Sequence, residues 1–248
     1  METTYTFQRI ERKYLVDEVT KKRLLHRIGD RLLPDAFGRS TICSVYLDTP
    51  DHRIIRNSLD AGAYKEKLRL RSYGTPGPQD TVFLELKKKF QGVVYKRRVS
   101  LPLKDALQYF STGQKPVTGQ IMDEIHYAML FYGWPAPAMV ISYEREAYGW
   151  ADDPAFRLTF DAAPRARSTA LRLEKGSAGS PLLPEGMALM ELKSGGAMPL
   201  PLSHALNELG IAPASFSKYG TAYTWSLAAR LPQPTISTKG VLEHVSNL

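Results

Sequence analysis

Positively charged side chains occupy every second position within residues 63–74, AYKEKLRLRSYG. They are Lys65, Lys67, Arg69 and Arg71. Because alternate residues of a β-strand share one face, a strand here places four cations in one row, about 6.6 Å apart. Each neighbouring pair repels by about 2.5 kcal/mol at an effective dielectric near 20, but by much less in water. An enclosed row therefore requires a bound anion, whereas an exposed row does not.

The same excess of cations recurs on one face of other predicted strands. For any single strand, the simple alternative is the solvated outer face of a half-buried antiparallel sheet. Outer faces usually mix both signs of charge, however, and these faces are strongly positive in sum. Their carboxylates are chiefly Glu11, Glu85, Asp161 and Glu191, and their cations are Arg9, Lys13, Lys65, Lys67, Arg69, Arg71, Lys87, Lys89, Lys96, Arg98, Arg145, Arg157 and Lys193.

If these faces line one channel, the channel suits a polyanion held by charge-assisted contacts. Its few carboxylates would suit Mg²⁺ or Mn²⁺, which bind oxygen ligands and are commonly shared between carboxylates and phosphate oxygens. Arginine and lysine would neutralise charge while a phosphoryl group transfers. The residues therefore predict triphosphate chemistry.

The predicted elements that would position these residues form an α+β fold. Strands are expected over residues 5–16, 40–50, 63–73, 81–90, 93–101, 138–150, 155–161 and 187–196, mostly antiparallel because their links are short. A helix should start at Asp17 or Thr20 and end before Pro34, and further helices should cover residues 104–110, 119–132, 203–209 and 215–231. Eight strands can close a barrel around one narrow ligand, so we expect an eight-stranded antiparallel β-barrel with flanking helices.

Length and composition favour one domain. The chain has 248 residues, 43% of them hydrophobic, and a formal net charge of +8, which suggests a nucleic acid, an anionic membrane surface or a phosphorylated small molecule as partner. We expect a single domain over residues 1–230, an exposed excursion over 162–186 and a loosely ordered tail over 231–248. The single cysteine, Cys43, and the lack of an apolar signal or membrane segment predict a soluble, cytoplasmic protein.

Other common chemistries lack their sequence signatures. There is no phosphate-binding loop of the G-x-x-x-x-G-K-[ST] type and no G-x-G-x-x-G after a strand. The five histidines, at positions 26, 52, 126, 204 and 244, show no paired ligand spacing. Cys43 lies in a predicted strand, where packing is its expected role.

Nine short motifs occur in the order expected of a VTC domain, and the chain resembles that family over about residues 5–225. The motifs are ERKYLV (11–16), SVYLDTPD (44–51), KLRLRSYG (67–74), FLELKKK (83–89), KRRV (96–99), YEREAY (143–148), FRLTFD (156–161), MELK (190–193) and SKYGT (217–221). VTC domains are the polyphosphate-polymerase branch of the triphosphate tunnel metalloenzymes, which include CYTH cyclases and triphosphatases. The resemblance implies a tunnel that binds ATP or another triphosphate, with Mn²⁺ or Mg²⁺ as cofactor.

The resemblance also implies roles for individual residues. The implied catalytic residues are Lys13, Lys67, Arg69, Arg71, Lys87, Arg145 and Glu191. Lys65, Lys96, Arg98, Arg157, Arg165, Lys193 and Lys218 would join the cations of that set in binding phosphate, with Lys193 and Lys218 near a tunnel mouth. Glu191, Glu11 and Glu85 would hold the metal.

One departure from the wider superfamily concerns the first strand. That superfamily begins with E-x-E-x-K, whereas Arg9, Glu11 and Lys13 stand here, so a cation replaces the first carboxylate. The loss of a metal ligand or water-activating group argues against hydrolysis and toward a phosphate end as acceptor, which needs little base assistance. The VTC branch shares this tendency.

Three functions remain open from the sequence. The first is a polyphosphate polymerase that moves the γ-phosphate of ATP to a growing polyphosphate chain, and the second is a tunnel triphosphatase. The third is a non-catalytic module that binds polyanions. Nucleic acid is not expected, because Tyr46, Tyr64 and Tyr73 near the basic strands are more simply explained by strand packing. Membrane or regulatory partner chains would be separate proteins, and the oligomeric state is left open.

Overall fold

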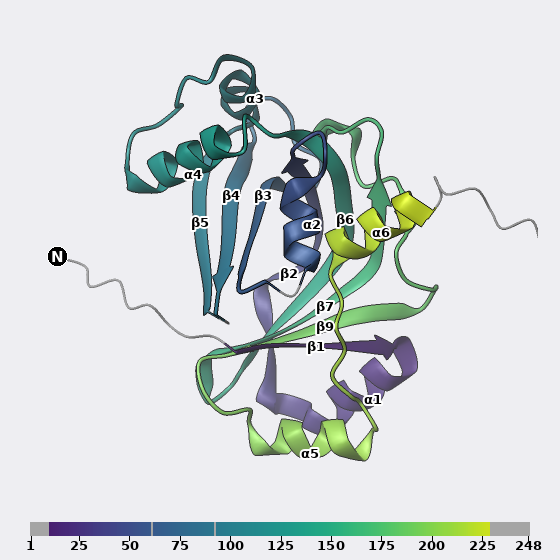
Figure 1. Cartoon of the computed structure of the whole chain (residues 1–248). Helices are drawn as coiled ribbons and strands as arrows, with labels where there is room; N and C mark the ends of the chain where they lie inside the picture. Colours follow the sequence, from purple (N-terminus) through teal and green to yellow (C-terminus); the bar gives the residue numbers. More distant parts are fainter. Residues whose placement is uncertain (1–9, 61, 92, 229–248) are drawn as a thin grey trace, which may run out of the picture.

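One antiparallel sheet organises the protein, whose computed structural model describes residues 10–60, 62–91 and 93–228 (Figure 1). Within these residues the strands are β1 (Ile10–Asp17), β2 (Leu32–Asp48), β3 (Tyr64–Tyr73), β4 (Thr81–Phe90), β5 (Val93–Pro102), β6 (Ala136–Trp150), β7 (Asp153–Arg167), β8 (Ser180–Pro181) and β9 (Met187–Ser194). The helices are α1 (Glu18–Ile28), α2 (Arg53–Leu59), α3 (Leu103–Thr112), α4 (Gln120–Phe131), α5 (Leu200–Glu208) and α6 (Lys218–Ala228). None of them is long and apolar enough to cross a membrane.

The sheet curves but does not close. Its hydrogen-bonded order is β1-β9-β7-β6-β2-β3-β4-β5, with β8 paired to β7. The eight predicted strands are present, yet no ladder between β1 and β5 occurs among the described residues, so the expected eight-stranded barrel is not confirmed. The free edge of β1 is covered by the chain that leads to α6, because the Ala214 amide donates to the Lys13 carbonyl at 2.7 Å. Around Lys13 and Tyr14, that edge is therefore unavailable to β5.

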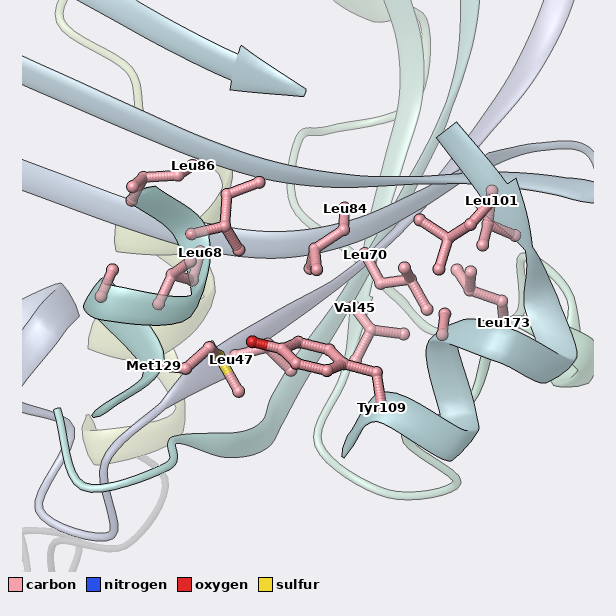
Figure 2. Close-up of a cluster of buried hydrophobic side chains, with 14 of the residues drawn as sticks. Val45, Leu47, Leu68, Leu70, Leu84, Leu86, Leu101, Tyr109, Met129 and Leu173 are labelled. Atoms are coloured by element: carbon pink, nitrogen blue, oxygen red, sulfur yellow. The ribbon is translucent and has the colours of Figure 1, made fainter. Parts of the chain in front are cut away.

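The outer face of β3 and β4 packs against α3 and α4, as Figure 2 shows. Leu68, Leu70, Leu84 and Leu86 are buried there with Tyr109 of α3. Each fully buried leucine contributes about 1.5–3 kcal/mol to stability relative to an exposed one. Since the leucines alternate with the cations, their burial fixes which face of each strand the cations occupy.

A second core holds the other end of the sheet. Helices α1 and α5 lie against one face of β1, β9 and β7, below them in Figure 1, and cover Tyr14 and Phe160. Asp17, one of the two predicted candidates, is the N-cap of α1, and its carboxylate accepts from the Thr20 amide at 2.6 Å. Because the residues of β1 and β9 that are buried in this core are even-numbered, the odd-numbered ones face the opposite side, toward α6.

Two segments differ from expectation. Helix α2 was not predicted. The buried carboxylate of Asp48 accepts from the amides of Ile54 and Ile55, at 2.9 and 3.0 Å. The first turn of α2 is therefore held by a residue that lies outside the usual N-cap position. The excursion over 162–186 is partly integrated, because β7 continues to Arg167 and Leu182 is buried. The predicted tail, 231–248, lies outside the described residues.

Candidate functional site

A cavity of about 690 Å³ opens on the concave side of the sheet. Its size is typical of a site for a small-molecule ligand. Its lining includes ten cations and three glutamates, in contrast to the mainly apolar lining of most ligand sites. They are Lys13, Lys65, Lys67, Arg69, Arg71, Lys87, Lys89, Arg145, Lys193 and Lys218, with Glu11, Glu66 and Glu191.

The β3 wall carries the row of four cations at alternate positions from Lys65 to Arg71. Arg69 donates to the phenol oxygen of Tyr46 at 3.1 Å, and Arg71 donates to that of Tyr143 at 3.2 Å. Both tyrosines line the cavity, although Tyr46 was expected only to pack within a strand. Lys65, at the start of β3, donates to the Ser58 carbonyl at 3.0 Å. The row therefore faces a cavity rather than open solvent.

The opposite wall contains a tight cluster of charges from β6, β7, β9 and α6. Arg145 donates twice to Asp161, at 2.6 and 2.7 Å, and Lys218 also donates to Asp161. Glu191 is held more loosely, at 3.4 Å from Lys218, 3.6 Å from Lys193 and 3.8 Å from Arg145. Burial disfavours its charged form, but Lys218 and Lys193 outweigh burial and hold the pKa of Glu191 well below its usual range. Glu191 is thus an ionised carboxylate whose three cationic partners all lie 3.4 Å or more away.

Glu11 is the second carboxylate of this wall. Lys87 of β4 reaches it at 3.3 Å and Lys13 at 3.4 Å, so an ion pair links β1 to β4, two strands that are not hydrogen-bonded to each other. Burial opposes ionisation of Glu11, but the two lysines lower its pKa overall. In the register of β1 and β9, Lys13 stands opposite Glu191 and Glu11 opposite Lys193. The two carboxylates are therefore diagonal neighbours, which are usually about 7–8 Å apart between Cα atoms.

This donor set fits a divalent metal only in part. Mg²⁺ is commonly held by one or two carboxylates together with substrate phosphates. Glu11 and Glu191 could supply that pair, whereas the described residues contain no group of three or more His, Cys, Asp or Glu side chains suited to a metal. The residues present therefore fit a metal shared with phosphate oxygens rather than one enclosed by protein alone.

The segment before α6 lines the cavity and accepts hydrogen bonds from two of the cavity lysines. Lys13 donates to the Phe216 carbonyl at 3.0 Å, and Lys67 donates to the Ser217 hydroxyl at 3.1 Å. The sequence predicted that Phe216 and Ser217 lie inside the last helix, but that helix, α6, begins at Lys218. Protein oxygens thus hold positions that phosphate oxygens could take.

Glu85 lies outside the cavity lining, within a cluster of cations. Its buried carboxylate, 1% exposed, accepts from Arg69 at 2.7 Å and from Arg98 at 2.6 Å, and Lys96 lies 2.7 Å away. Burial raises its pKa, but Arg69, Arg71 and Lys96 outweigh that effect and lower it overall. Each carboxylate oxygen is thus already engaged. We infer that Glu85 organises Lys96 and Arg98 rather than binding metal.

Besides Lys96 and Arg98, which pair with Glu85, two predicted phosphate ligands do not join the cavity lining. Arg157 has a half-exposed side chain that pairs with Asp35. Arg165 is exposed and donates to the Gly179 carbonyl at 3.1 Å, where it supports the β7–β8 connection. The sequence did not distinguish them from the cations of the cavity, because spacing does not show how far along a strand the cavity extends.

Affinity for phosphate should depend on pH near 8. Burial lowers the pKa of Lys67 to about 8, and Lys13 and Lys87 act in the same direction. Burial raises the pKa of Tyr46, but Arg69 and Lys67 lower it to about 8 overall. As pH rises through 8, one group loses a positive charge and the other gains a negative one, so both changes weaken anion binding.

The measurement is the Kd for inorganic triphosphate, without metal, at pH 7 and pH 9. Lys67→Arg is the matched variant because arginine keeps its proton throughout this range. The affinity of the unmodified protein relative to that variant should fall about tenfold between the two pH values, which cancels ionisation of the ligand itself. A constant ratio would contradict a Lys67 pKa near 8.

Comparisons with known proteins agree with the fold. A family model described as the VTC domain matches residues 8–227. A solved structure of a candidate adenylate cyclase from Bacillus halodurans superposes with a TM-score of 0.54 at 15% identity, over 85% of this chain and 95% of that one. A candidate adenylyl cyclase from Hippeastrum, described as having a dominant triphosphatase activity, gives a TM-score of 0.52 at 14% identity, over 88% and 96% of the two chains. Curated protein sequences give no match.

Proposed function

The chain belongs to the VTC domain family, and we propose that it is a metal-dependent polyphosphate polymerase that transfers the γ-phosphate of ATP to a growing polyphosphate chain. The observation that carries this proposal is the cavity lined by ten cations with only three glutamates. Such a lining is costly when empty and is stabilised by several phosphate groups bound at once. Location in the cytoplasm, partner chains and the single-domain boundary at residue 230 remain predictions from the sequence.

The cations would bind different phosphates of the substrate, according to the strand on which they lie. Lys67, Arg69 and Arg71 would bind successive phosphates along β3, while Lys13 and Lys87 would approach from β1 and β4. Arg145 is fixed by two hydrogen bonds to Asp161, so it would present its remaining donors with little loss of side-chain entropy. Lys193 and Lys218 would add charge beside Glu191.

Transfer would break the bond between the γ-phosphorus and its bridging oxygen and release ADP. The same phosphorus would form a bond to a terminal oxygen of the acceptor chain. That oxygen already carries negative charge, so no general base is needed, and the cations would stabilise charge spread over the transferring group. A bound Mg²⁺ or Mn²⁺, held through Glu191 and Glu11, would supply further neutralisation of phosphate oxygens.

Hydrolysis is the second candidate function. The Hippeastrum protein of similar fold is described as a triphosphatase. Hydrolysis requires a group that activates water, and two carboxylates, Glu11 and Glu191, line the cavity. Both carboxylates are held ionised by lysines, however, so their weak basicity favours a metal-binding role over proton removal from water.

A product-resolved assay separates these functions. Purified protein with ATP and Mn²⁺ should yield ADP together with long polyphosphate, visible on a gel, because the acceptor is a phosphate end rather than water. Release of orthophosphate without polymer would assign the triphosphatase. Binding of triphosphate without turnover, under Mn²⁺ or Mg²⁺, would leave a polyanion-binding module.

A further inference from the structure

Two aromatic side chains continue the cationic rows of β3 and β4 on the concave face. Tyr73 ends β3, two residues after Arg71, and Phe83 lies near the start of β4. Their rings meet edge to face, with centroids 5.6 Å apart and an interplanar angle of 88°. Tyr73 is 53% exposed and Phe83 is half-buried, so the pair presents a solvent-accessible aromatic surface.

This pair does not belong to a core. The apolar residues of β3 and β4 that pack against α3 and α4 are the even-numbered ones, such as Leu70 and Leu84, which point to the other face. Tyr73 and Phe83 share their face with cations instead. The guanidinium of Arg98 lies over the Phe83 ring, 4.3 Å from its centroid. Half-exposed rings stacked with a guanidinium are the elements from which proteins build platforms for nucleobases.

The platform adjoins the phosphate-binding cavity. Phe83 stands directly opposite Arg71 in the register of β3 and β4, which places the two Cβ atoms about 5 Å apart. Arg71 lines the cavity. Arg98 is in turn anchored by Glu85, the carboxylate that also holds Arg69. A ligand with phosphates on Arg69 and Arg71 would therefore bring its next group onto Tyr73, Phe83 and Arg98.

We propose that Tyr73, Phe83 and Arg98 form a stacking site for the base of a nucleoside triphosphate, beyond the Arg71 end of the cavity. The inference rests on the proposed function in one respect, namely that the substrate is a nucleotide. It orients that nucleotide, with the base at the Arg71 end and the terminal phosphate toward Lys67 and Lys87. Every base has a π-face, so stacking alone should accept ATP and GTP with similar affinity.

The test compares two ligands that share a triphosphate and differ in the base. Kd values for ATP and for inorganic triphosphate would be measured calorimetrically, without divalent metal, for the unmodified protein and for Tyr73→Ala. Loss of a stacking partner should weaken ATP binding by about five- to a hundredfold. Binding of inorganic triphosphate should not change, because no phosphate contact is removed.

Two further variants sharpen the comparison. Tyr95→Ala removes a tyrosine that is 36% exposed, on the opposite face of the same sheet, where its β4 partner is Lys88, and it should change neither Kd. Tyr73→Trp keeps a stacking surface and should preserve or tighten ATP binding. Phe83→Leu, which retains an apolar side chain, should weaken ATP binding in the same direction as Tyr73→Ala.

The outcomes separate this inference from the proposed function. Equal ATP affinity in Tyr73→Ala and the unmodified protein would overturn the stacking site, even if the protein makes polyphosphate. Equal losses for ATP and inorganic triphosphate would also overturn it, since they would indicate a disturbed phosphate site. A loss specific to ATP, in a protein that makes no polymer, would support the base site and reject the polymerase.

Discussion

Glu191→Gln is expected to reduce metal-dependent turnover of ATP by about 100- to 1,000-fold, the usual effect of losing one group that stabilises transition-state charge. Glu191 is the carboxylate of the cavity best placed to bind a metal. Its ion-pair distances, from 3.4 to 3.8 Å, are long compared with the hydrogen bonds of 2.6 and 2.7 Å that Arg145 makes to Asp161. Its oxygens can therefore be drawn to a cation at small cost.

Phosphate affinity should change in the opposite direction. Substitution by glutamine removes a negative charge from a cationic cavity and releases Lys218 and Lys193 from partial neutralisation. Kd for inorganic triphosphate, measured with the metal chelated, should therefore stay equal or decrease. Electron paramagnetic resonance of Mn²⁺ with a non-hydrolysable ATP analogue should in parallel show weaker metal binding.

Glu144→Gln is the matched control for this experiment. Glu144 is on the same strand as Arg145 but faces the other side of the sheet, where it accepts from Thr41 at 2.8 Å. Its substitution should change neither turnover nor Mn²⁺ affinity. Full activity in Glu191→Gln, with unchanged Mn²⁺ binding, would contradict the assignment of Glu191 as a metal ligand.

Strand alternation accounts for most of what the sequence predicted correctly. On β3, the leucines at 68 and 70 are buried and the cations at 67, 69 and 71 face the cavity, because a period of two permits no other arrangement once one face is covered. The N-cap at Asp17 was likewise predictable from one residue and its neighbours. Local patterns with a fixed geometry thus carry over directly to the fold.

Features that depend on distant partners could not be predicted in this way. Helix α2 is held by Asp48, several residues upstream, and the hydroxyl of Tyr219 in α6 donates to the same carboxylate at 2.8 Å. The closure of the sheet depended on whether β1 pairs with β5 or with the chain near Ala214. Strand number alone does not decide between these partners. Similarly, the sequence placed Glu85 on the cation-bearing face, but spacing could not show that Arg69, Arg98 and Lys96 all contact its carboxylate.

Glu85→Gln is expected to destabilise the fold by about 3–5 kcal/mol, the usual cost of removing one member of a buried ion pair. The variant would leave Arg69, Arg98 and Lys96 without their shared counter-charge. For a domain of this size, each kcal/mol lowers Tm by about 2–4 °C, so a decrease of about 6–20 °C should be visible in a thermal melt. Glu124→Gln is the control, because Glu124 pairs with Arg97 at 2.7 Å on the outer face, where an ion pair contributes at most about 1 kcal/mol.

Added triphosphate distinguishes this structural role from metal binding. An anion that binds only the folded state at 100 times its Kd stabilises it by about 2.7 kcal/mol. The Glu85→Gln variant should gain more than the unmodified protein at the same triphosphate concentration, because its uncompensated cations bind the anion more tightly. If Glu85 were a metal ligand instead, the variant would melt near the normal temperature and lose Mn²⁺ affinity. A carboxylate that already accepts from two arginines cannot bind a metal without releasing them, so stability should be the property that changes.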